Sequence, residues 1–250
     1  MTELIALITG ANKGIGLETA RQLGARGMTV LLGARDSARG GAAAEGLRAE
    51  GVDACVVELD VTDAASAQKA ADWVEAEHGR LDVLVNNAGV ATSGGPPSGT
   101  SLDGMRAVFE TNVLGVVAVT NALLPLLRRA PAARIVNVSS EVGSVTLSGD
   151  RSFPLWHMPA TLPYPASKAA LNMITVMYAK ELAGTPIKVN AANPGYCATD
   201  LNAGSGFRAA AEGASVSVRL ACLPDDGPTG TFWGYRWGAD DADPYGDLPW

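Results

Sequence analysis

Short apolar runs alternate along this chain with longer alanine-rich segments, and this alternation limits the folds open to it more than any other feature. The runs are nearly continuous in apolar residues, as is typical of strands buried on both faces of a parallel sheet. Parallel neighbours need a crossover between them, usually a helix. The predicted strands are Leu4–Ile8, Thr29–Leu32, Ala54–Glu58, Val83–Val85, Arg134–Val138, Ile187–Ala191 and a less apolar Thr231–Trp233. The predicted helices are Gly16–Arg26, Ala64–Glu77, Leu102–Arg129 and Tyr164–Leu182.

This rhythm predicts an α/β fold built on a parallel sheet. It continues across the turn-rich loop Gly94–Gly99, so we expect a single domain over residues 1–250. Pro125 is expected to bend or shorten the third helix, because proline lacks an N–H donor and clashes with the preceding turn. The stretch Gly234–Trp250, rich in Asp, Gly and Trp, is a C-terminal tail that either caps the fold or frays.

The charge and cysteine content exclude several classes of function. With 19 Lys and Arg against 26 Asp and Glu, the formal net charge of −7 does not attract a polyanion, so no nucleic-acid partner is expected. Cys55, Cys197 and Cys222 lack the spacing of a metal site, and we expect reduced thiols and no metal. The N-terminal segment has no basic region or cleavage site, and no run of about 18 apolar residues occurs. We therefore expect a cytoplasmic protein without a membrane span.

The first predicted strand leads directly into a glycine-rich loop, TGANKGIG at residues 9–16, and then into a helix. Gly10 permits a tight turn, while Gly14 and Gly16 let the backbone approach a pyrophosphate that the N–H groups of the helix start attract. A strand, a glycine triplet and a helix in this order predict a dinucleotide site. Its candidate contacts are Gly10, Asn12, Lys13, Gly14, Ile15 and Gly16. Asn12 and Lys13 fit equally well as solvated turn residues.

The end of the second strand favours NADP over NAD. Arg35 would accept the 2′-phosphate of NADP, with Lys13 as a second cation, whereas an acidic residue at this point binds the ribose hydroxyl of NAD. Asp36 stands one position later and leaves the NAD alternative open. After the third strand, Asp60 and Val61 are candidates for holding the adenine, although Asp60 also fits as a helix N-cap.

Four further motifs follow in order: Asn86–Gly89 after the fourth strand, Asn112, Ser139–Ser140 after the fifth strand, and Tyr164–Lys168. Together with the glycine loop they resemble the short-chain dehydrogenase/reductase family, from Leu4 to about Trp233. NKGIG, GAR and the later LPDDGPTGTFWG are similar to carbonyl reductases. The resemblance implies a doubly wound Rossmann-type fold, with a mainly seven-stranded parallel sheet and helices on both faces. It also implies a catalytic tetrad of Asn112, Ser140, Tyr164 and Lys168.

Carbonyl reduction needs these groups for chemical reasons as well. A proton must reach the oxygen while hydride reaches the carbon, and Tyr164 is the predicted donor. A free tyrosine has a pKa near ~10, which an ammonium one helical turn away is expected to lower, and Lys168 has that spacing. The Ser140 hydroxyl would stabilise charge on the substrate oxygen. Taken singly, a Tyr/Lys pair is also typical of a solvated helix face, and a Ser-Ser pair of a turn.

The remaining site residues rest on the family resemblance. It assigns the catalytic role to Ser140 and not Ser139, and makes Asn112 the holder of a water beside Lys168. It implies further cofactor contacts at Asn87, Ala88, Gly89, Tyr164, Lys168, Pro194, Gly195, Cys197 and Thr199. Cys197 takes a position often filled by valine, and we expect it to alter the pocket shape and not to act as a reactive thiol.

Two segments depart from the family pattern. Leu147–Pro163 lengthens the connection before Tyr164, and its apolar residues form either a substrate wall or a cover for exposed core. Leu201–Ala214 is glycine-rich and forms either a mobile lid or a linker. The sequence leaves open whether the chain is a monomer or a homo-oligomer.

The predicted function is the reversible reduction of a ketone or aldehyde to an alcohol with NADPH, and the expected partner is the small-molecule carbonyl compound. A β-ketoacyl-thioester reductase or a hydroxyl dehydrogenase of a biosynthetic pathway is the neighbouring alternative. A dinucleotide-binding sensor without catalysis is the alternative of another class, although a sensor has no need of a proton donor.

Overall fold

The computed structural model describes residues 4–92, 95–239 and 243–250, and one eight-stranded sheet runs through them. The strands are β1 (Ile5–Thr9), β2 (Thr29–Ala34), β3 (Ala54–Glu58), β4 (Val83–Asn86), β5 (Arg134–Val138), β6 (Lys188–Asn193), β7 (Phe232–Tyr235) and β8 (Tyr245–Asp247). Their order is β3-β2-β1-β4-β5-β6-β7-β8, and every pair from β1 to β7 is parallel. The reversal of order at β1 and β4 is the doubly wound arrangement that the sequence predicted.

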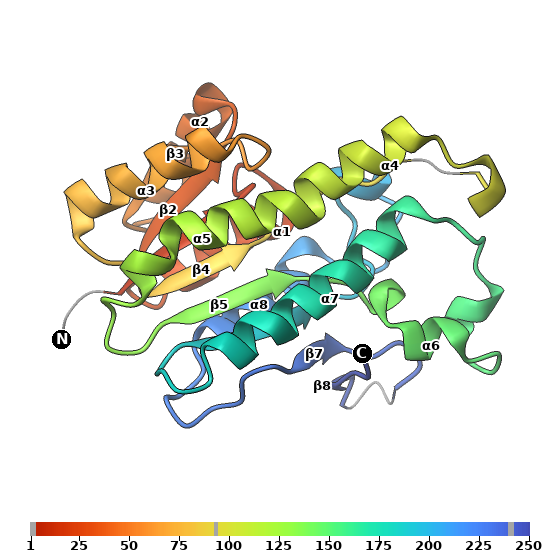
Figure 1. Cartoon of the computed structure of the whole chain (residues 1–250). Helices are drawn as coiled ribbons and strands as arrows, with labels where there is room; N and C mark the ends of the chain where they lie inside the picture. The colour runs from red at the N-terminus through yellow and green to blue at the C-terminus, as the bar shows by residue number, and fades with distance from the viewer. Residues whose placement is uncertain (1–3, 93–94, 240–242) are drawn as a thin grey trace.

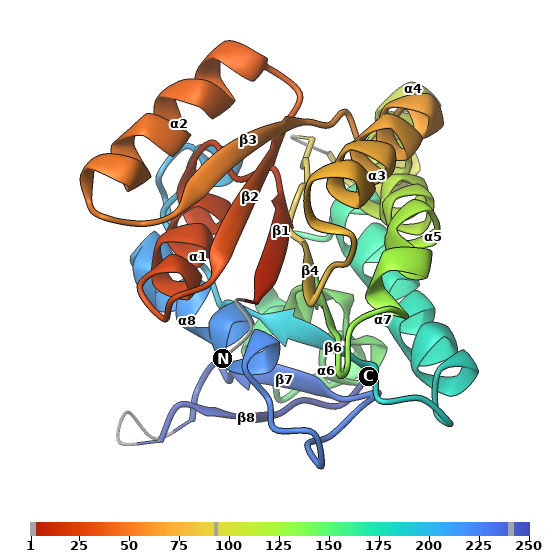
Figure 2. The ribbon, with the colours of Figure 1, turned by 90° about the vertical axis from the view of Figure 1, so that its left-hand side faces the viewer.

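Helices cover both faces of this sheet, as Figures 1 and 2 show. They are α1 (Gly14–Gly24), α2 (Ser37–Ala49), α3 (Ala64–His78), α4 (Leu102–Phe109), α5 (Gly115–Leu127), α6 (Val145–Gly149), α7 (Pro163–Glu181) and α8 (Ala210–Ala221). In Figure 2 the sheet separates α1, α2 and α8 from α3, α4, α5 and α7. The predicted fold class is confirmed.

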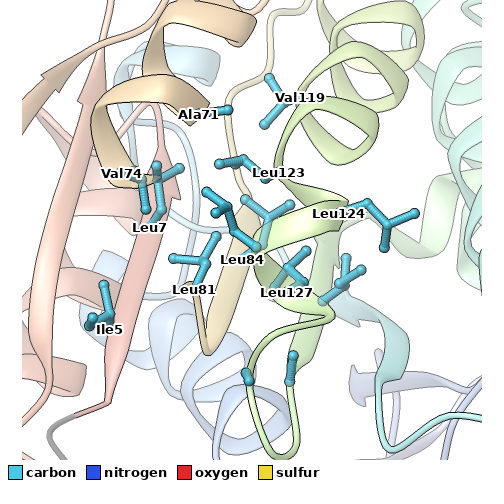
Figure 3. Packing of buried hydrophobic residues seen from close by; sticks show 14 of the residues in the cluster. Ile5, Leu7, Ala71, Val74, Leu81, Leu84, Val119, Leu123, Leu124 and Leu127 are labelled. Atoms are coloured by element: carbon cyan, nitrogen blue, oxygen red, sulfur yellow. The ribbon is translucent and has the colours of Figure 1, made fainter. Parts of the chain in front are cut away.

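Each central strand supplies apolar side chains to both faces, because successive residues of a strand point in opposite directions. Leu7 of β1 and Leu84 of β4 pack against Val74 of α3 and Leu123 of α5 (Figure 3). Ile8 belongs to a second buried cluster on the opposite face. Each such side chain contributes about 1.5–3 kcal/mol by leaving water. This double burial is why the strands read as continuous apolar runs.

The third predicted helix is interrupted. A π-helical turn, Glu110–Leu114, separates α4 from α5. Pro125 lies inside α5, which ends at Leu127, two residues before the predicted end. Together α4, the π turn and α5 form one continuous stretch, Leu102–Leu127, that is long and apolar enough to cross a membrane and is half buried inside the protein. In its second half, Val119, Leu123, Leu124 and Leu127 belong to the core in Figure 3, so burial accounts for much of its apolar composition.

Three helices were not predicted: the five-residue α6, α2 and α8. α2 contains three glycines and one large apolar residue, Leu47, so its periodicity is weak. α8 begins at Ala210, inside the segment predicted as a lid or linker, so that prediction is wrong for Ala210–Ala214. Ala214 is fully buried, and the Gln22 side chain of α1 donates to the Ala211 carbonyl oxygen over 2.8 Å. The packing of α8 on α1 therefore fixes this part of the chain.

The C-terminal tail caps the sheet over its described residues. β8 pairs antiparallel with β7, and the Trp250 ring stacks on Phe232 with 5.5 Å between centroids. The Thr146 hydroxyl at the start of α6 donates to the Trp250 main-chain oxygen over 2.8 Å. Residues 240–242 of the tail and Gly94 of the predicted 94–99 loop lie outside the described residues.

Candidate active site

The predicted site residues follow the carboxyl ends of the parallel strands, and the glycine loop after β1 forms one side of the site. Gly10 and Gly14 have φ angles of 63° and 57°, a region that favours glycine. A Cβ on Gly10 would lie 3.0 Å from the Ala88 Cα, and one on Gly16 would lie 2.4 Å from the Asn87 Nδ2. Gly10 and Gly16 therefore permit close packing against the segment after β4, and Gly14 begins α1.

Asn87 holds the glycine loop in place. Its Nδ2 donates to the Thr9 carbonyl oxygen over 2.8 Å, and its backbone N–H and that of Ala88 both donate to the Thr9 hydroxyl over 2.9 Å. The Asn87 Nδ2 and backbone N–H are thus engaged by Thr9. The Asn87 Oδ1 accepts no hydrogen bond among the described residues, which leaves it for a contact with a cofactor.

Arg35 and Asp36 have different surroundings in the structure. Asp36 is the N-cap of α2, accepting from the backbone N–H groups of Ala38 and Arg39 over 3.1 and 3.0 Å. Arg35 is exposed just beyond β2, and among the described residues it has no hydrogen bond or salt bridge. The carboxylate is committed to the helix start, and the guanidinium is free to bind a phosphate.

Asp60 lies next to Arg35 and is not the N-cap of α3, since Asp63 caps that helix by accepting from the Ala65 N–H. Asp60 instead accepts from the backbone N–H and hydroxyl of Thr62 over 3.0 and 2.7 Å. Burial opposes its charge, but Thr62 and the nearby Arg35 hold the pKa of Asp60 below its ordinary value. Val61, the next residue, is half-buried.

Lys13 forms an ion pair in the structure, with its Nζ 2.6 Å from Asp200 Oδ2. Asp200 begins the 3₁₀ turn Asp200–Asn202 after β6. The hydrogen bond from Lys13 lowers the pKa of Asp200. Both side chains are exposed, so the pair is accessible to a competing anion. The ion pair connects the glycine loop to this 3₁₀ turn.

Tyr164 and Lys168 lie on consecutive turns of α7, as the spacing predicted. Lys168 is only 4% exposed, and its Nζ donates to the Val138 carbonyl oxygen over 2.8 Å. It lies 5.4 Å from the centre of the Tyr164 ring. Burial lowers the pKa of Lys168 to about 8. Burial also raises the pKa of Tyr164 to about 12, against a hydrogen bond with Ser140 that lowers it. The expected lowering by Lys168 is therefore not seen, because desolvation dominates.

The two serines after β5 have different surroundings. Ser139 is buried, and its hydroxyl donates to Asn172 Oδ1 over 2.6 Å. Ser140 is half-buried and its side chain bonds Tyr164. The following turn packs directly on α7, because Gly143 has no Cβ to strike the Lys168 backbone. Of the two hydroxyls, only that of Ser140 is directed to Tyr164.

Asn112 lies in the π-helical turn and is fully buried. Its Nδ2 donates to the Val90 carbonyl oxygen and to the Ser167 hydroxyl over 2.9 and 3.0 Å, and its Oδ1 accepts from the Val90 N–H over 2.8 Å. The Ser167 hydroxyl in turn donates to the Tyr164 carbonyl oxygen over 2.7 Å. Ser167 thus links Asn112 to Tyr164. Sequence reasoning missed it, although it stands inside the motif between Tyr164 and Lys168.

The segment after β6 packs closely against later parts of the chain. Gly195 has a φ of 75°, and a Cβ there would lie 2.7 Å from Arg208 and 2.8 Å from Tyr235. Pro194 is buried, and its carbonyl oxygen accepts from the Cys197 thiol over 3.4 Å. Burial raises the pKa of Cys197, which opposes formation of a reactive thiolate. Thr199 is the N-cap residue of the following 3₁₀ turn, and its backbone N–H donates to Asn202 Oδ1 over 3.2 Å.

The segment Leu147–Pro163 is largely exposed. Leu147 packs against the cluster of Ala191, Phe232 and Leu248, so this end covers core. Further along, Trp156 is 46% exposed, and the Arg151 guanidinium lies 5.2 Å from its ring centre. Only the solvent-facing apolar side chains of this segment are therefore available for the predicted substrate wall.

The predicted residues thus form two groups at one edge of the sheet. Ser140, Tyr164, Lys168 and Asn112 lie together around the start of α7, and Arg35 and Asp60 lie together beyond β2 and β3. The glycine loop and the start of α1 lie between β1 and β4, where the strand order reverses. A dinucleotide-dependent oxidoreductase has its binding site at this place in a doubly wound sheet.

Comparison with known proteins specifies the family. The model of the short chain dehydrogenase family matches residues 4–207, and the chain belongs to this family. It is 38% identical over 231 residues to the short-chain dehydrogenase anuI of Penicillium roqueforti, covering 88% of this chain and 89% of that protein. It is 34% identical to carbonyl reductase 1 of Bos taurus, whose name specifies NADPH, over 91% of this chain and 95% of that protein.

A solved structure agrees with these sequence matches. Salutaridine reductase from Papaver somniferum superposes with a TM-score of 0.81 at 32% identity, covering 92% of this chain and 99% of that one. The chain is therefore an NAD(P)-dependent oxidoreductase, and it is similar to carbonyl reductases as the sequence motifs indicated.

Proposed function

We propose that this protein reduces a ketone or aldehyde to an alcohol with NADPH, and that Tyr164 donates the proton. One observation carries the proposal: Ser140 bonds the Tyr164 phenol, with the buried Lys168 ammonium beneath the same ring, at the edge that also holds the glycine loop. Similarity to carbonyl reductase 1 and to salutaridine reductase supports the substrate class. In this proposal residues 1–250 form one domain that binds the dinucleotide and performs catalysis in the cytoplasm.

The proposed chemistry uses the four residues in distinct roles. The nicotinamide supplies hydride to the carbonyl carbon. Ser140 donates a hydrogen bond to the carbonyl oxygen, and Tyr164 gives up its proton as negative charge develops there. With a pKa of about 12, the Tyr164 phenol stays protonated at neutral pH and is ready to donate. Lys168, with a pKa of about 8, carries the replacement proton.

In the proposal Asn112 does not react itself but holds neighbouring groups in position. Its Nδ2 hydrogens are both bonded within the protein, which fixes the π-helical turn beside α7. A Cβ on Gly89 would lie 3.5 Å from the Asn112 Oδ1 and 3.8 Å from the Lys168 Nζ, so both atoms face the space beside Gly89. A water in that space would accept from Lys168 and donate to Asn112, and would continue the proton path.

The residues around the glycine loop fit NADPH. The start of α1 has no acidic residue in its first turn, which suits a pyrophosphate. Arg35 is unpaired among the described residues, and Asp36, which would have selected NAD, is used as a helix cap. In the proposal the 2′-phosphate of NADPH binds Arg35 and replaces Asp200 as the partner of the Lys13 ammonium. The predicted contacts at Asn12, Ile15, Val61, Ala88, Pro194, Gly195, Cys197 and Thr199 complete the cofactor site.

Tyr164→Phe tests the proton donor. We expect kcat for carbonyl reduction to fall by about a hundred- to ten-thousandfold, the usual contribution of a general acid, while NADPH binding is retained. Tyr178→Phe on the same helix is the matched control, because the Tyr178 hydroxyl bonds only Asn121 among the described residues. Unchanged turnover in Tyr164→Phe, measured as NADPH oxidation with a panel of free and thioester-linked ketones, would remove Tyr164 from the mechanism.

Arg35→Ala tests the choice of cofactor. Loss of a charge-assisted bond to the 2′-phosphate should raise the Kd for NADPH by about tenfold or more and leave that for NADH nearly unchanged. Arg39→Ala is the control, since Arg39 is an exposed arginine in the first turns of α2 and pairs with Asp36. Fluorescence titration measures both constants. An equal increase in Kd for the two cofactors would show that Arg35 does not bind the 2′-phosphate.

A further inference from the structure

Glu141 directly follows Ser140 and has no role in the proposed mechanism, yet it is only 4% exposed. It opens the 3₁₀ turn Glu141–Gly143, which packs on α7 beside Lys168. A buried carboxyl costs free energy unless other groups compensate it. The groups that contact the Glu141 carboxyl therefore indicate its role.

Hydrogen bonds of Glu141 join the ends of three strands. Its backbone N–H donates to Asn193 Oδ1 at the end of β6 over 3.1 Å. Its carboxylate accepts from the Trp237 N–H, beyond the end of β7, over 3.4 Å, and from the Asn193 side chain. Asn193 Nδ2 also donates to the Tyr235 carbonyl oxygen over 2.6 Å. The segment after β7 is thus tied to the turn that begins at Ser140.

The segment held by Glu141 carries part of an aromatic cluster, which we define as Tyr196, Phe207, Tyr235 and Trp237. Phe207 is its centre, with 6.1 Å between its ring centroid and those of Tyr196 and Trp237, and 6.0 Å to that of Tyr235. Phe207 is 56% exposed and Tyr196 41% exposed. The cluster therefore presents open aromatic surface to solvent.

This aromatic cluster borders the candidate active site at two points. Trp237 is bonded to Glu141, the neighbour of Ser140. Tyr196 precedes Cys197, whose thiol is near enough to Tyr164 to raise the pKa of its phenol. Open aromatic rings beside a reacting carbonyl favour a substrate with a flat ring, because offset or tilted aromatic pairs attract beyond their buried area.

We propose that Glu141 is a positioning residue of the substrate site: it fixes the Trp237 end of the aromatic cluster against the serine turn and so favours carbonyl compounds with an aryl substituent. The inference rests on the proposed function, since it concerns selection among carbonyl substrates. It adds a determinant of specificity outside the four proposed catalytic residues.

The strength of this attachment depends on pH. Burial raises the pKa of Glu141 to about 7, against the hydrogen bonds from Trp237 and Asn193 that lower it. The other charged or titratable side chains nearby are Lys168 and Tyr164 of α7, with Arg236 and Arg208 around Tyr235, whereas α6 carries none. Above about pH 7 the carboxyl is ionised and accepts hydrogen bonds more strongly than its neutral form does.

The test measures kcat/KM for an aryl methyl ketone and for a linear methyl ketone of equal carbon number. Both substrates use the same proton donor, so the ratio of the two values cancels the titration of Tyr164 and Lys168. For the wild type we expect the ratio to rise about fivefold between about pH 6 and pH 8, the difference between a charged and a neutral acceptor. We expect Glu141→Gln, which keeps the shape without the charge, to give a low ratio independent of pH.

Glu141→Leu and Glu45→Gln complete the experiment. Glu141→Leu removes both acceptors and should lower the ratio further, mainly through a higher KM for the aryl ketone. Glu45 is exposed on α2, so Glu45→Gln should keep the wild-type rise. A wild-type ratio that does not change with pH, or a Glu141→Gln ratio that follows the wild type, overturns the role of Glu141. Failure of the wild type to reduce either ketone or any other carbonyl overturns the proposed function instead.

Discussion

At the scale of single residues, Lys168 combines burial with a charge that the proposed mechanism needs. Its ammonium is enclosed, and the Val138 carbonyl oxygen is its hydrogen-bond acceptor among the described residues. Because burial lowers its pKa to about 8, the lysine loses its proton in a range where Tyr164 keeps its own. The proton path from Lys168 should therefore set the upper pH limit of reduction.

The corresponding prediction is a pH profile with opposite slopes in the two directions. Below about pH 8 the ammonium form predominates and reduction should be fastest, and kcat for reduction should fall as pH rises through that value. Alcohol oxidation needs the deprotonated path and should rise over the same range. Rates measured with saturating cofactor check this. A profile with the same slope in both directions would contradict the role of Lys168.

At the scale of elements, the Lys13–Asp200 pair connects the glycine loop to the 3₁₀ turn after β6. In the proposal the cofactor phosphate competes with Asp200 for the same ammonium. Asp200→Asn should remove the competitor and lower the Kd for NADPH by about two- to fivefold, the range of an exposed ion pair, and leave NADH unaffected. Titration at low and high salt measures the effect, which salt should reduce. Weaker NADPH binding in Asp200→Asn would show that Asp200 supports the site and does not compete for it.

Local patterns made most elements predictable. The first strand, the glycine loop and α1 follow one another in sequence, so their order alone indicated the phosphate-binding turn. α2 escaped prediction because Gly40, Gly41 and Gly46 weaken its periodicity, and α8 because it follows directly on a glycine-rich stretch. The burial of α8 against α1 is a tertiary contact that no local sequence pattern predicts.

At the scale of the whole molecule, the parallel sheet brings the strand ends together and thereby assembles the site. The motifs at Ser140, Tyr164 and Lys168 could be predicted because they follow the glycine loop in an order that resembles one family, although each motif alone fits a turn or a solvated helix face. The Asp200 partner of Lys13 could not, since the two stand far apart in the chain. Glu141 was missed for the same reason, because its meaning depends on Asn193 and Trp237.

The central claim joins the two groups of residues in one reaction, with hydride passing from NADPH to a carbonyl carbon. NADPH that carries deuterium at the transferred position on C4 of the nicotinamide tests it most directly. With a reducible ketone, the wild type should form alcohol that gains one deuterium at the carbinol carbon, and Tyr164→Phe should bind the same NADPH and form almost none. Mass spectrometry of the product distinguishes the results. Alcohol without deuterium, or equal labelled product from Tyr164→Phe, would contradict the account.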